Sequence, residues 1–414
     1  MKILLLSNEY PPHVYGGAGV HVEHLTRELR RLEDGQHSLS ILCFGEQEED
    51  EASVRVRGIR PASAPLAFQD PRHQRLFDTL FRNVIMAGSA RQADIIHCHT
   101  WYTHFAGCLL KELLDAPLVL TTHSLEPQRP WKEEQLGAAY RASAWLERTA
   151  FTHADGVIAV SQTMKTETQE VYAVPPERIR VIHNGIDLDR YRPTSDAGTL
   201  VSLGIDPGKP FILFVGRITR QKGLIHLVHA LPYLRTGTQV VLCAGAPDTA
   251  ALDAEIREKV GQVRSRGDLD LVWIAEILPP ERLVVLYSHA ALFVCPSIYE
   301  PFGIVNLEAM ACGTPVVASA VGGIREAVTH GETGILVPFD RSEAGDFGPR
   351  DPEGFARDLA AAINELLDAP ARLQAMGAAA RRRVEEHFGW GSIAARTLDF
   401  YREVTETYRR KGSR

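Results

Sequence analysis

Short apolar runs alternate with apolar positions at helical spacing along the whole chain. This alternation is typical of buried parallel strands joined by crossover helices. The strands predicted in the first half are 2–7, 39–44, 94–99, 118–122, 156–160 and 179–183. Those predicted in the second half are 211–216, 240–244, 271–275, 291–295, 315–319 and 334–337. The pattern predicts an α/β protein with two doubly wound, Rossmann-like domains.

A polar stretch with turn residues, 184–198, separates the two halves. The 414 residues suffice for two cores of about 200 residues each. The last segment has apolar residues on one helical face, and we expect it to cross back and pack on the first domain. The predicted division is 1–195 for the first domain, 196–389 for the second and 390–414 for the returning helix.

Composition narrows the class of protein. A hydrophobic share of 45% with 23% charged residues can build globular cores without disulfides or metals. The formal net charge of -7 argues against nucleic acid as a partner. The N-terminal apolar run is too short for a signal peptide, and the sequence lacks a run of about 18 apolar residues. We expect a cytoplasmic protein with no membrane partner.

Two carboxylates lie at one predicted strand-to-helix junction. Glu300 follows the strand 291–295, and Glu308 lies further along, inside the next helix. One interpretation is structural, with Glu300 favoured by the helix dipole and Glu308 exposed. The functional interpretation is that Glu308 binds the two ribose hydroxyls and Glu300 binds a sugar. The N–H groups that follow Phe302 would then reach the same sugar or its phosphate, since Gly303 has no side chain to block them.

Arg217 and Lys222 flank the loop after the strand 211–216. A guanidinium and an ammonium in one crevice can neutralise a diphosphate without a metal ion. Each residue alone is explained equally well as a surface cation. Together with Glu300 and Glu308, the two cations favour a site for a nucleotide diphosphate.

The first half contains a glycine-rich segment at Gly16 and Gly17. It lacks the third glycine of a dinucleotide fingerprint and trails its strand by about eight residues, so a nicotinamide site is not favoured. A backbone loop that closes over a ligand from the other domain fits better.

His97 and His99 lie on one face of the strand 94–99, and His104 and His123 lie at or near strand ends. They lack a carboxylate or cysteine partner at metal-binding spacing, so we expect no metal and no cofactor. His123 is explained either as a core or loop histidine or as a residue that faces the cleft.

Taken together, these segments resemble the donor site of retaining GT-B glycosyltransferases of family 4. Residues 8–21, 99–104 and 123–137 are similar to the subgroup of short bacterial glycogen synthases and maltose-1-phosphate synthases. The resemblance covers nearly the whole chain. It implies a GT-B architecture in which two Rossmann-like domains face each other across a cleft.

The resemblance also implies a hexosyltransferase that moves an α-glucosyl group from ADP-glucose with retention and without metal. The acceptor would be glucose-1-phosphate or the end of an α-1,4-glucan. His123 and Glu300 would act at the reacting sugar. The remaining implied donor-binding residues are Arg217 and Lys222 for the diphosphate, Glu308 for the ribose, the backbone of Phe302, Gly303 and Ile304 for the glucose, and Gly16 and Gly17 for phosphate.

The acceptor is less well defined, because the sequence departs from the longer glycogen and starch synthases. Those enzymes carry a lysine where this chain has Val14-Tyr15, and a cysteine at Phe302. A sugar phosphate acceptor would need a cation, which Arg129 and Lys132 beside Trp131 could supply. Both are also explained as solvated loop charges.

Other functions remain open. One is a transferase that uses a UDP- or GDP-sugar with a sucrose-, trehalose- or inositol-type acceptor, and another is an inactive carbohydrate-binding module. A glycoside hydrolase also uses two carboxylates, but it does not need the accompanying cations. The expected partners are a nucleotide sugar and a sugar phosphate or glucan, and a homodimer is left open.

Overall fold

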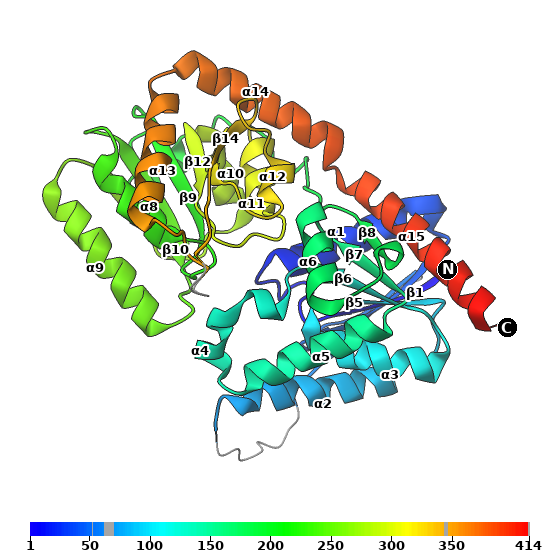
Figure 1. The fold of residues 1–414 in the computed structure, drawn as a ribbon. Helices are drawn as coiled ribbons and strands as arrows, with labels where there is room; N and C mark the ends of the chain where they lie inside the picture. The colour runs from blue at the N-terminus through cyan, green and yellow to red at the C-terminus, as the bar shows by residue number, and fades with distance from the viewer. Residues whose placement is uncertain (52, 62–69, 343–346, 413–414) are drawn as a thin grey trace. The chain divides into compact units, whose positions relative to one another are not determined.

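Two parallel sheets organise the chain (Figure 1). The computed structural model describes residues 1–51, 53–61, 70–342 and 347–412. Unit 1 comprises Met1–Gly185 together with the segment from Trp390 onward, and unit 2 comprises Ile186–Gly389. The predicted α/β class, with two doubly wound sheets, is confirmed.

The sheet of unit 1 has the strand order β3-β4-β2-β1-β5-β6-β7-β8. Its strands are β1 (Lys2–Ser7), β2 (Ser38–Phe44), β3 (Glu48–Asp50), β4 (Val54–Ile59), β5 (Ile95–His99), β6 (Leu118–Thr122), β7 (Gly156–Ala159) and β8 (Ile179–Val181). The order reverses between β1 and β5, so the loops that follow these strands lie where α/β sheets bind ligands.

Helices cover both faces of this sheet. They are α1 (Gly17–Arg31), α2 (His73–Ser89), α3 (His104–Leu114), α4 (Glu133–Leu136), α5 (Ala139–His153), α6 (Gln162–Tyr172) and α15 (Trp390–Gly412). Helices α2, α3 and α5 pack together, and α1 packs with α15 (Figure 1). Trp390, Ile393 and Tyr401 of α15 are buried in the same cluster as Leu5 and Ile95, so the C-terminal helix is part of the core of unit 1.

The antiparallel pair β3 and β4 was not predicted. Residues 46–51 are an acidic segment, and β3 lies within it at the sheet edge. Its side chains are all exposed, and Asp50 forms an ion pair with Arg55 at 3.0 Å. An edge strand with no buried face leaves no apolar pattern in the sequence, which is why the periodicity did not reveal it.

The sheet of unit 2 is entirely parallel, with the order β11-β10-β9-β12-β13-β14. Its strands are β9 (Phe211–Arg217), β10 (Gln239–Gly245), β11 (Asp270–Ile274), β12 (Leu292–Cys295), β13 (Val316–Ser319) and β14 (Gly334–Val337). The order reverses between β9 and β12. The loops after these two strands carry Lys222 and Glu300, so the cation and the carboxylate lie at one switch point.

The helices of unit 2 are α7 (Gly198–Ser202), α8 (Leu224–Ala230), α9 (Ala250–Arg266), α10 (Pro280–His289), α11 (Ile304–Ala311), α12 (Ile324–Ala327), α13 (Pro352–Leu367) and α14 (Pro370–His387). The units divide ten residues before the predicted boundary at 195/196. The reason is local bonding, because Ile186 donates its N–H to the Phe388 carbonyl at 2.8 Å and Tyr191 bonds Glu308.

Within the described ranges, none of the helices combines the length and the apolar character that crossing a bilayer requires.

We predict that the hydroxyl of Tyr401 stabilises unit 1. It lies 2.5 Å from Nδ1 of His97, and both side chains are fully buried. Tyr401→Phe leaves a buried ring nitrogen without a partner and should lower the free energy of unfolding by about 1–3 kcal/mol. Urea unfolding monitored by circular dichroism measures this. The matched control is Tyr408→Phe, whose hydroxyl contacts Asp115 at the exposed end of α15. Equal stability of the two variants would contradict the prediction.

Candidate active site

Glu300 is buried at the junction between β12 and α11. Its Oε2 accepts hydrogen bonds from Lys222 Nζ at 2.7 Å and from the Ser297 hydroxyl at 3.2 Å. Burial disfavours the charged ammonium of Lys222, but the nearby Glu300 carboxylate outweighs it, and the pKa of Lys222 is raised. The structure thus brings together two of the predicted site residues as a largely buried ion pair, in which 23% of the Lys222 side chain and 8% of the Glu300 side chain are exposed.

Glycines fix the backbone around Glu300. Gly303 has a φ of 92°, and a Cβ there would lie 2.5 Å from Asn306 Nδ2. Gly322 has a φ of 49°, and its added Cβ would lie 2.0 Å from the Glu300 carbonyl oxygen. Gly323 donates its N–H to that same carbonyl at 3.0 Å. Gly322 and Gly323 were not predicted from the sequence, although two consecutive glycines shortly after a predicted strand were a usable signal.

Helix α11 begins at Ile304 with no side-chain cap. The first N–H groups of a helix have no acceptor within it, so those of Ile304 and Val305 are available to a ligand oxygen. Phe302 is buried, with its ring centroid 5.7 Å from that of Phe388. This packing anchors the turn that presents the free amides.

Two tyrosines orient the carboxylate of Glu308. Tyr191 donates to Oε1 at 3.1 Å and Tyr287 donates to Oε2 at 2.8 Å. Burial raises the pKa of Glu308, and the two hydroxyls oppose that rise. The sequence analysis did not identify either tyrosine, since they lie far from Glu308 along the chain.

Arg217 ends β9 and its guanidinium donates to Asp248 at 2.8 Å. Asp248 follows β10, the strand next to β9. Arg217 is more than half exposed, so it remains accessible to a ligand anion.

In unit 1, Glu9 shapes the glycine-rich loop. Its Oε2 accepts hydrogen bonds from the N–H groups of Tyr15 at 2.8 Å and Gly16 at 2.9 Å. A Cβ at Gly19 would lie 2.6 Å from the same oxygen, so this carboxylate requires a glycine there. Gly17 is the first residue of α1, which begins without a side-chain cap. Glu9 was not singled out from the sequence.

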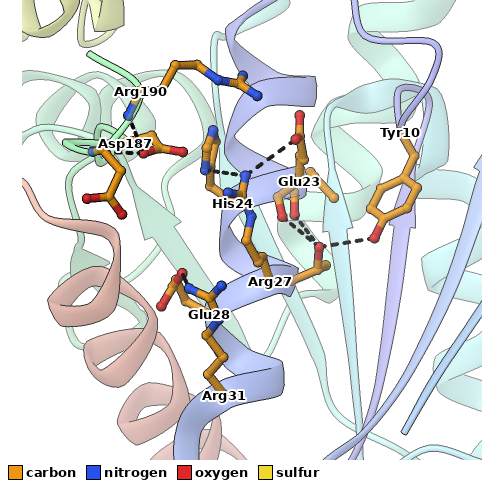
Figure 2. A network of polar contacts seen from close by, with 11 residues as sticks. Tyr10, Glu23, His24, Arg27, Glu28, Arg31, Asp187 and Arg190 are labelled. Atoms are coloured by element: carbon orange, nitrogen blue, oxygen red, sulfur yellow. Dashed lines mark hydrogen bonds and ion pairs between the residues drawn. The ribbon is translucent and has the colours of Figure 1, made fainter. Parts of the chain in front are cut away.

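Polar contacts also tie α1 to the loop after β1 (Figure 2). The hydroxyl of Tyr10 lies 3.2 Å from that of Thr26, and Arg27 contacts Glu23 and His24 one turn earlier. The Tyr10–Thr26 contact joins the middle of α1 to the loop after β1, whereas the Arg27 contacts lie within the helix.

Three histidines cluster at the carboxyl edge of this sheet. His99 ends β5 and His123 follows β6, the neighbouring strand, so His99 Nδ1 and His123 Nε2 lie 3.0 Å apart. His21 of α1 stacks edge-on against His123, and its Nδ1 lies 2.8 Å from Asn184 Oδ1. His123 was predicted from the sequence as a site residue, but His21 was not.

All three rings are neutral. Burial lowers the pKa of His21 to about 4, and it lowers the pKa values of His99 and His123 well below the usual value. Neutral imidazoles can bond sugar hydroxyls. Their ring nitrogens lie within 4.8 Å of one another, the one such histidine group found among the described residues, so they could also hold a metal ion. The expected absence of a metal therefore stays a prediction.

The three predicted acceptor residues differ in accessibility. Lys132 is buried and donates to Glu126, and burial lowers the pKa of its ammonium. Trp131 is buried as well. Arg129 keeps a quarter of its side chain exposed and donates to the Ser124 hydroxyl at 3.2 Å. The acceptor role stays a prediction, and Arg129 is the one of the three with an accessible charge.

Comparison with known proteins identifies the family. Residues 15–190 match the Glycosyltransferase Family 4 domain, and residues 200–346 match the domain called Glycosyl transferases group 1. The chain is 45% identical to "Alpha-maltose-1-phosphate synthase" of Mycobacterium tuberculosis over 98% of this chain and 100% of that protein. The chain therefore belongs to the glycosyltransferase family that has these two domains. The prediction of a hexosyltransferase is confirmed.

Other similar proteins support the same assignment of this glycosyltransferase. It is 31% identical to "Glycogen synthase" of Mycobacterium tuberculosis, over 97% of this chain and 94% of that protein. The structure of "Sucrose-phosphate synthase" from Thermosynechococcus elongatus superposes with a TM-score of 0.77 at 27% identity, covering 98% and 99% of the two chains. The starch synthase IV catalytic domain from Arabidopsis thaliana, bound to ADP and acarbose, shares the fold, with a TM-score of 0.72 at 19% identity and coverage of 98% and 99%. The GT-B fold is thereby confirmed.

We predict that the neutral histidines make unit 1 sensitive to mild acid. His21 stays neutral in the folded protein down to about pH 4, whereas an unfolded histidine takes up a proton near pH 6.5. Its contribution to stability is therefore complete above pH 6.5 and is lost as the pH falls toward 4. For His21 alone this amounts to about 3 kcal/mol.

Urea unfolding at pH 7.5, 6.0 and 5.0 tests this dependence. His21→Gln should make the free energy of unfolding fall less steeply between pH 6.5 and 5, because unfolding of this variant takes up about one proton fewer. His153→Gln, at an exposed position at the end of α5, is the control and should leave the dependence unchanged. Identical slopes for the wild type and His21→Gln would contradict the assignment.

Proposed function

We propose that this glycosyltransferase moves an α-glucosyl group from ADP-glucose to glucose-1-phosphate, and so makes α-maltose-1-phosphate. The observation that carries the proposal is the 45% identity, over both full lengths, to a protein with that activity in its name. The buried ion pair of Lys222 and Glu300, with Glu308 oriented nearby, supports it from the side of the site.

The donor would bind at the switch point of unit 2. Arg217 and Lys222 would neutralise the diphosphate, as guanidinium and ammonium groups do at phosphate sites. Glu308, already held by two tyrosine hydroxyls, offers carboxylate oxygens to the two ribose hydroxyls. The free amides at Ile304 and Val305 would bind oxygens of the glucosyl phosphate.

Lys222 would exchange partners when the donor binds. In the described structure its ammonium bonds Glu300, and a diphosphate would compete for it with two negative charges. Glu300 would then be free to accept hydrogen bonds from glucose hydroxyls. After this exchange Lys222 remains paired with a negative charge, and hydrogen bonds from glucose hydroxyls and from Ser297 replace Lys222 at Glu300, which lowers the cost of burying the carboxylate.

In the proposed reaction, an acceptor hydroxyl oxygen forms a bond to C1 of the glucosyl group, and the bond from C1 to the diphosphate oxygen breaks. The acceptor proton passes to the departing phosphate, and ADP leaves. The glycosidic bond keeps the α configuration. Cations at the diphosphate stabilise the negative charge that develops on the leaving group.

The histidine cluster would bind sugar hydroxyls in unit 1. His123 is neutral, and its Nε2 is already paired with His99, which fixes the ring. A neutral ring can donate a hydrogen bond to a sugar hydroxyl or accept one from it without adding charge. Both proposed substrates are charged and do not cross bilayers, so we place the enzyme in the cytoplasm.

A second candidate function is elongation of an α-1,4-glucan from the same donor. The 31% identity to a protein named glycogen synthase favours it. The two functions differ in the acceptor alone, so one assay separates them.

The assay combines the protein with ADP-, UDP- or GDP-glucose and either glucose-1-phosphate or glycogen, with EDTA present. We expect nucleotide release from ADP-glucose with glucose-1-phosphate, and an α-linked disaccharide phosphate by NMR. Release with neither acceptor from any donor contradicts the proposal, and release with glycogen alone favours the second candidate. Loss of turnover in EDTA would contradict the metal-free mechanism.

Glu300→Gln should lower kcat about ten- to a hundredfold, because the neutral amide loses a charge-assisted hydrogen bond to the reacting sugar. The affinity for ADP should fall much less. Steady-state kinetics together with calorimetric titration of ADP separate the two effects. Glu281→Gln, an exposed position in the first turn of α10, serves as the control. An unchanged kcat in Glu300→Gln would remove Glu300 from the reaction.

A further inference from the structure

Unit 1 contains a cavity of about 420 Å³ beside α2. Asn8, which follows β1, and Phe44, which ends β2, line it together with residues of α2. It therefore opens at the carboxyl edge of the sheet, where α/β domains bind ligands. Its volume falls within the range of sites for small molecules.

Arg82 is built into the wall of this cavity. Its guanidinium forms an ion pair with Asp78 at 2.9 Å and lies over the ring of Phe44, 4.6 Å from the ring centroid. The side chain is 16% exposed. Its Nε–H is buried and has no hydrogen-bond partner among the described residues. A fixed guanidinium with an unused donor is suited to an anion that offers two oxygens, such as a carboxylate or a phosphate.

Arg75 adds a second charge on the same helix. It lies seven residues before Arg82, which places both on one face of α2. Arg75 is exposed, and its guanidinium has no hydrogen bond or ion pair to the described part of the chain. The carboxylates in the same wall are engaged, since Asp78 pairs with Arg82 and Glu46 lies 3.3 Å from Arg60. Arg75 is therefore the charged arginine of the wall that no described carboxylate pairs with.

The rest of the wall suits a sugar. Tyr102 and Phe44 line the cavity with aromatic rings, against which the apolar C–H groups of a pyranose can pack. Asn8 and Asp78 offer polar groups for hydroxyls. The side-chain oxygen Oδ1 of Asn8 accepts a hydrogen bond from the Thr100 hydroxyl at 2.7 Å, which orients the amide. The positive charges of Arg129 and Arg75 both act to lower the pKa of Tyr102, against the effect of burial. The predicted acceptor residue Arg129 therefore lies close to this wall.

We propose that this cavity is the acceptor subsite, and that Arg75 and Arg82 bind the phosphate of a hexose phosphate. The proposal rests on the proposed function and names the residues that would select a phosphorylated acceptor. An uncharged glucan end would leave the charge of Arg75 unmatched, whereas a phosphate dianion matches it. The sequence predicted an acceptor site at Arg129, Trp131 and Lys132. In the structure Lys132 is paired with Glu126, whereas Arg75 of α2 lines the cavity and is exposed.

The test compares Arg75→Gln with Arg91→Gln, an exposed arginine just beyond the end of α2. Loss of one charge-assisted hydrogen bond should raise the KM for glucose-1-phosphate about ten- to a hundredfold in Arg75→Gln. The KM for ADP-glucose should change less than about twofold, and Arg75→Lys should recover part of the loss. Arg91→Gln should match the wild type.

A rise in the KM for ADP-glucose instead would mean that Arg75 binds the donor phosphates, and would overturn the proposal. Unchanged constants for both substrates would also overturn it, while leaving the proposed function intact. Calorimetric binding of glucose-1-phosphate without donor separates the two claims further. If the wild type binds this sugar phosphate and Arg75→Gln does not, the subsite stands even where no turnover occurs. Equal binding by both proteins would refute it.

Discussion

The pairing of Lys222 with Glu300 is the interaction on which the candidate site depends. It joins the loops after β9 and β12 at the point where the strand order of unit 2 reverses. Removing both charges from water is costly, and breaking such a pair by losing one partner typically costs about 3–5 kcal/mol. The pair is therefore stable only while each charge has a partner. A diphosphate can replace the carboxylate as the partner of Lys222, which links donor binding to the release of Glu300.

The surrounding structure holds this pair in place with little freedom. The carbonyl of Glu300 accepts the N–H of Gly323, and neither Gly303 nor Gly322 has room for a side chain. Buried Phe302 packs against Phe388 and anchors the turn. This rigidity positions the carboxylate before substrate arrives, so less free energy is spent on ordering the site.

Much of the fold followed from sequence because its strands are buried on both faces and leave continuous apolar runs. The strands of the two sheet centres lie within one or two residues of the predicted positions, for example β6 at Leu118–Thr122 and β9 at Phe211–Arg217. The edge strand β3 has no buried face and escaped detection. Within the site, residues joined by local motifs were found, as with Glu300 and Glu308. Tyr191, Tyr287, Glu9 and His21 were not, because tertiary folding alone brings them to their partners.

The same distinction explains the acceptor. Arg129 and Lys132 stood out because they flank a tryptophan, but burial of Lys132 against Glu126 is a tertiary property that no local pattern reveals. Arg75 and Arg82 lie on an ordinary amphipathic helix, so the sequence alone does not mark them as site residues. The structure shows that both line the cavity beside α2.

A crystal structure of the protein with bound ADP tests the exchange of partners at Lys222 most directly. The account predicts that Lys222 Nζ lies within hydrogen-bond distance of a diphosphate oxygen and no longer contacts Glu300, with Glu308 bonded to the ribose. An ADP molecule bound elsewhere, or a diphosphate that leaves the pair of Lys222 and Glu300 intact, would contradict it.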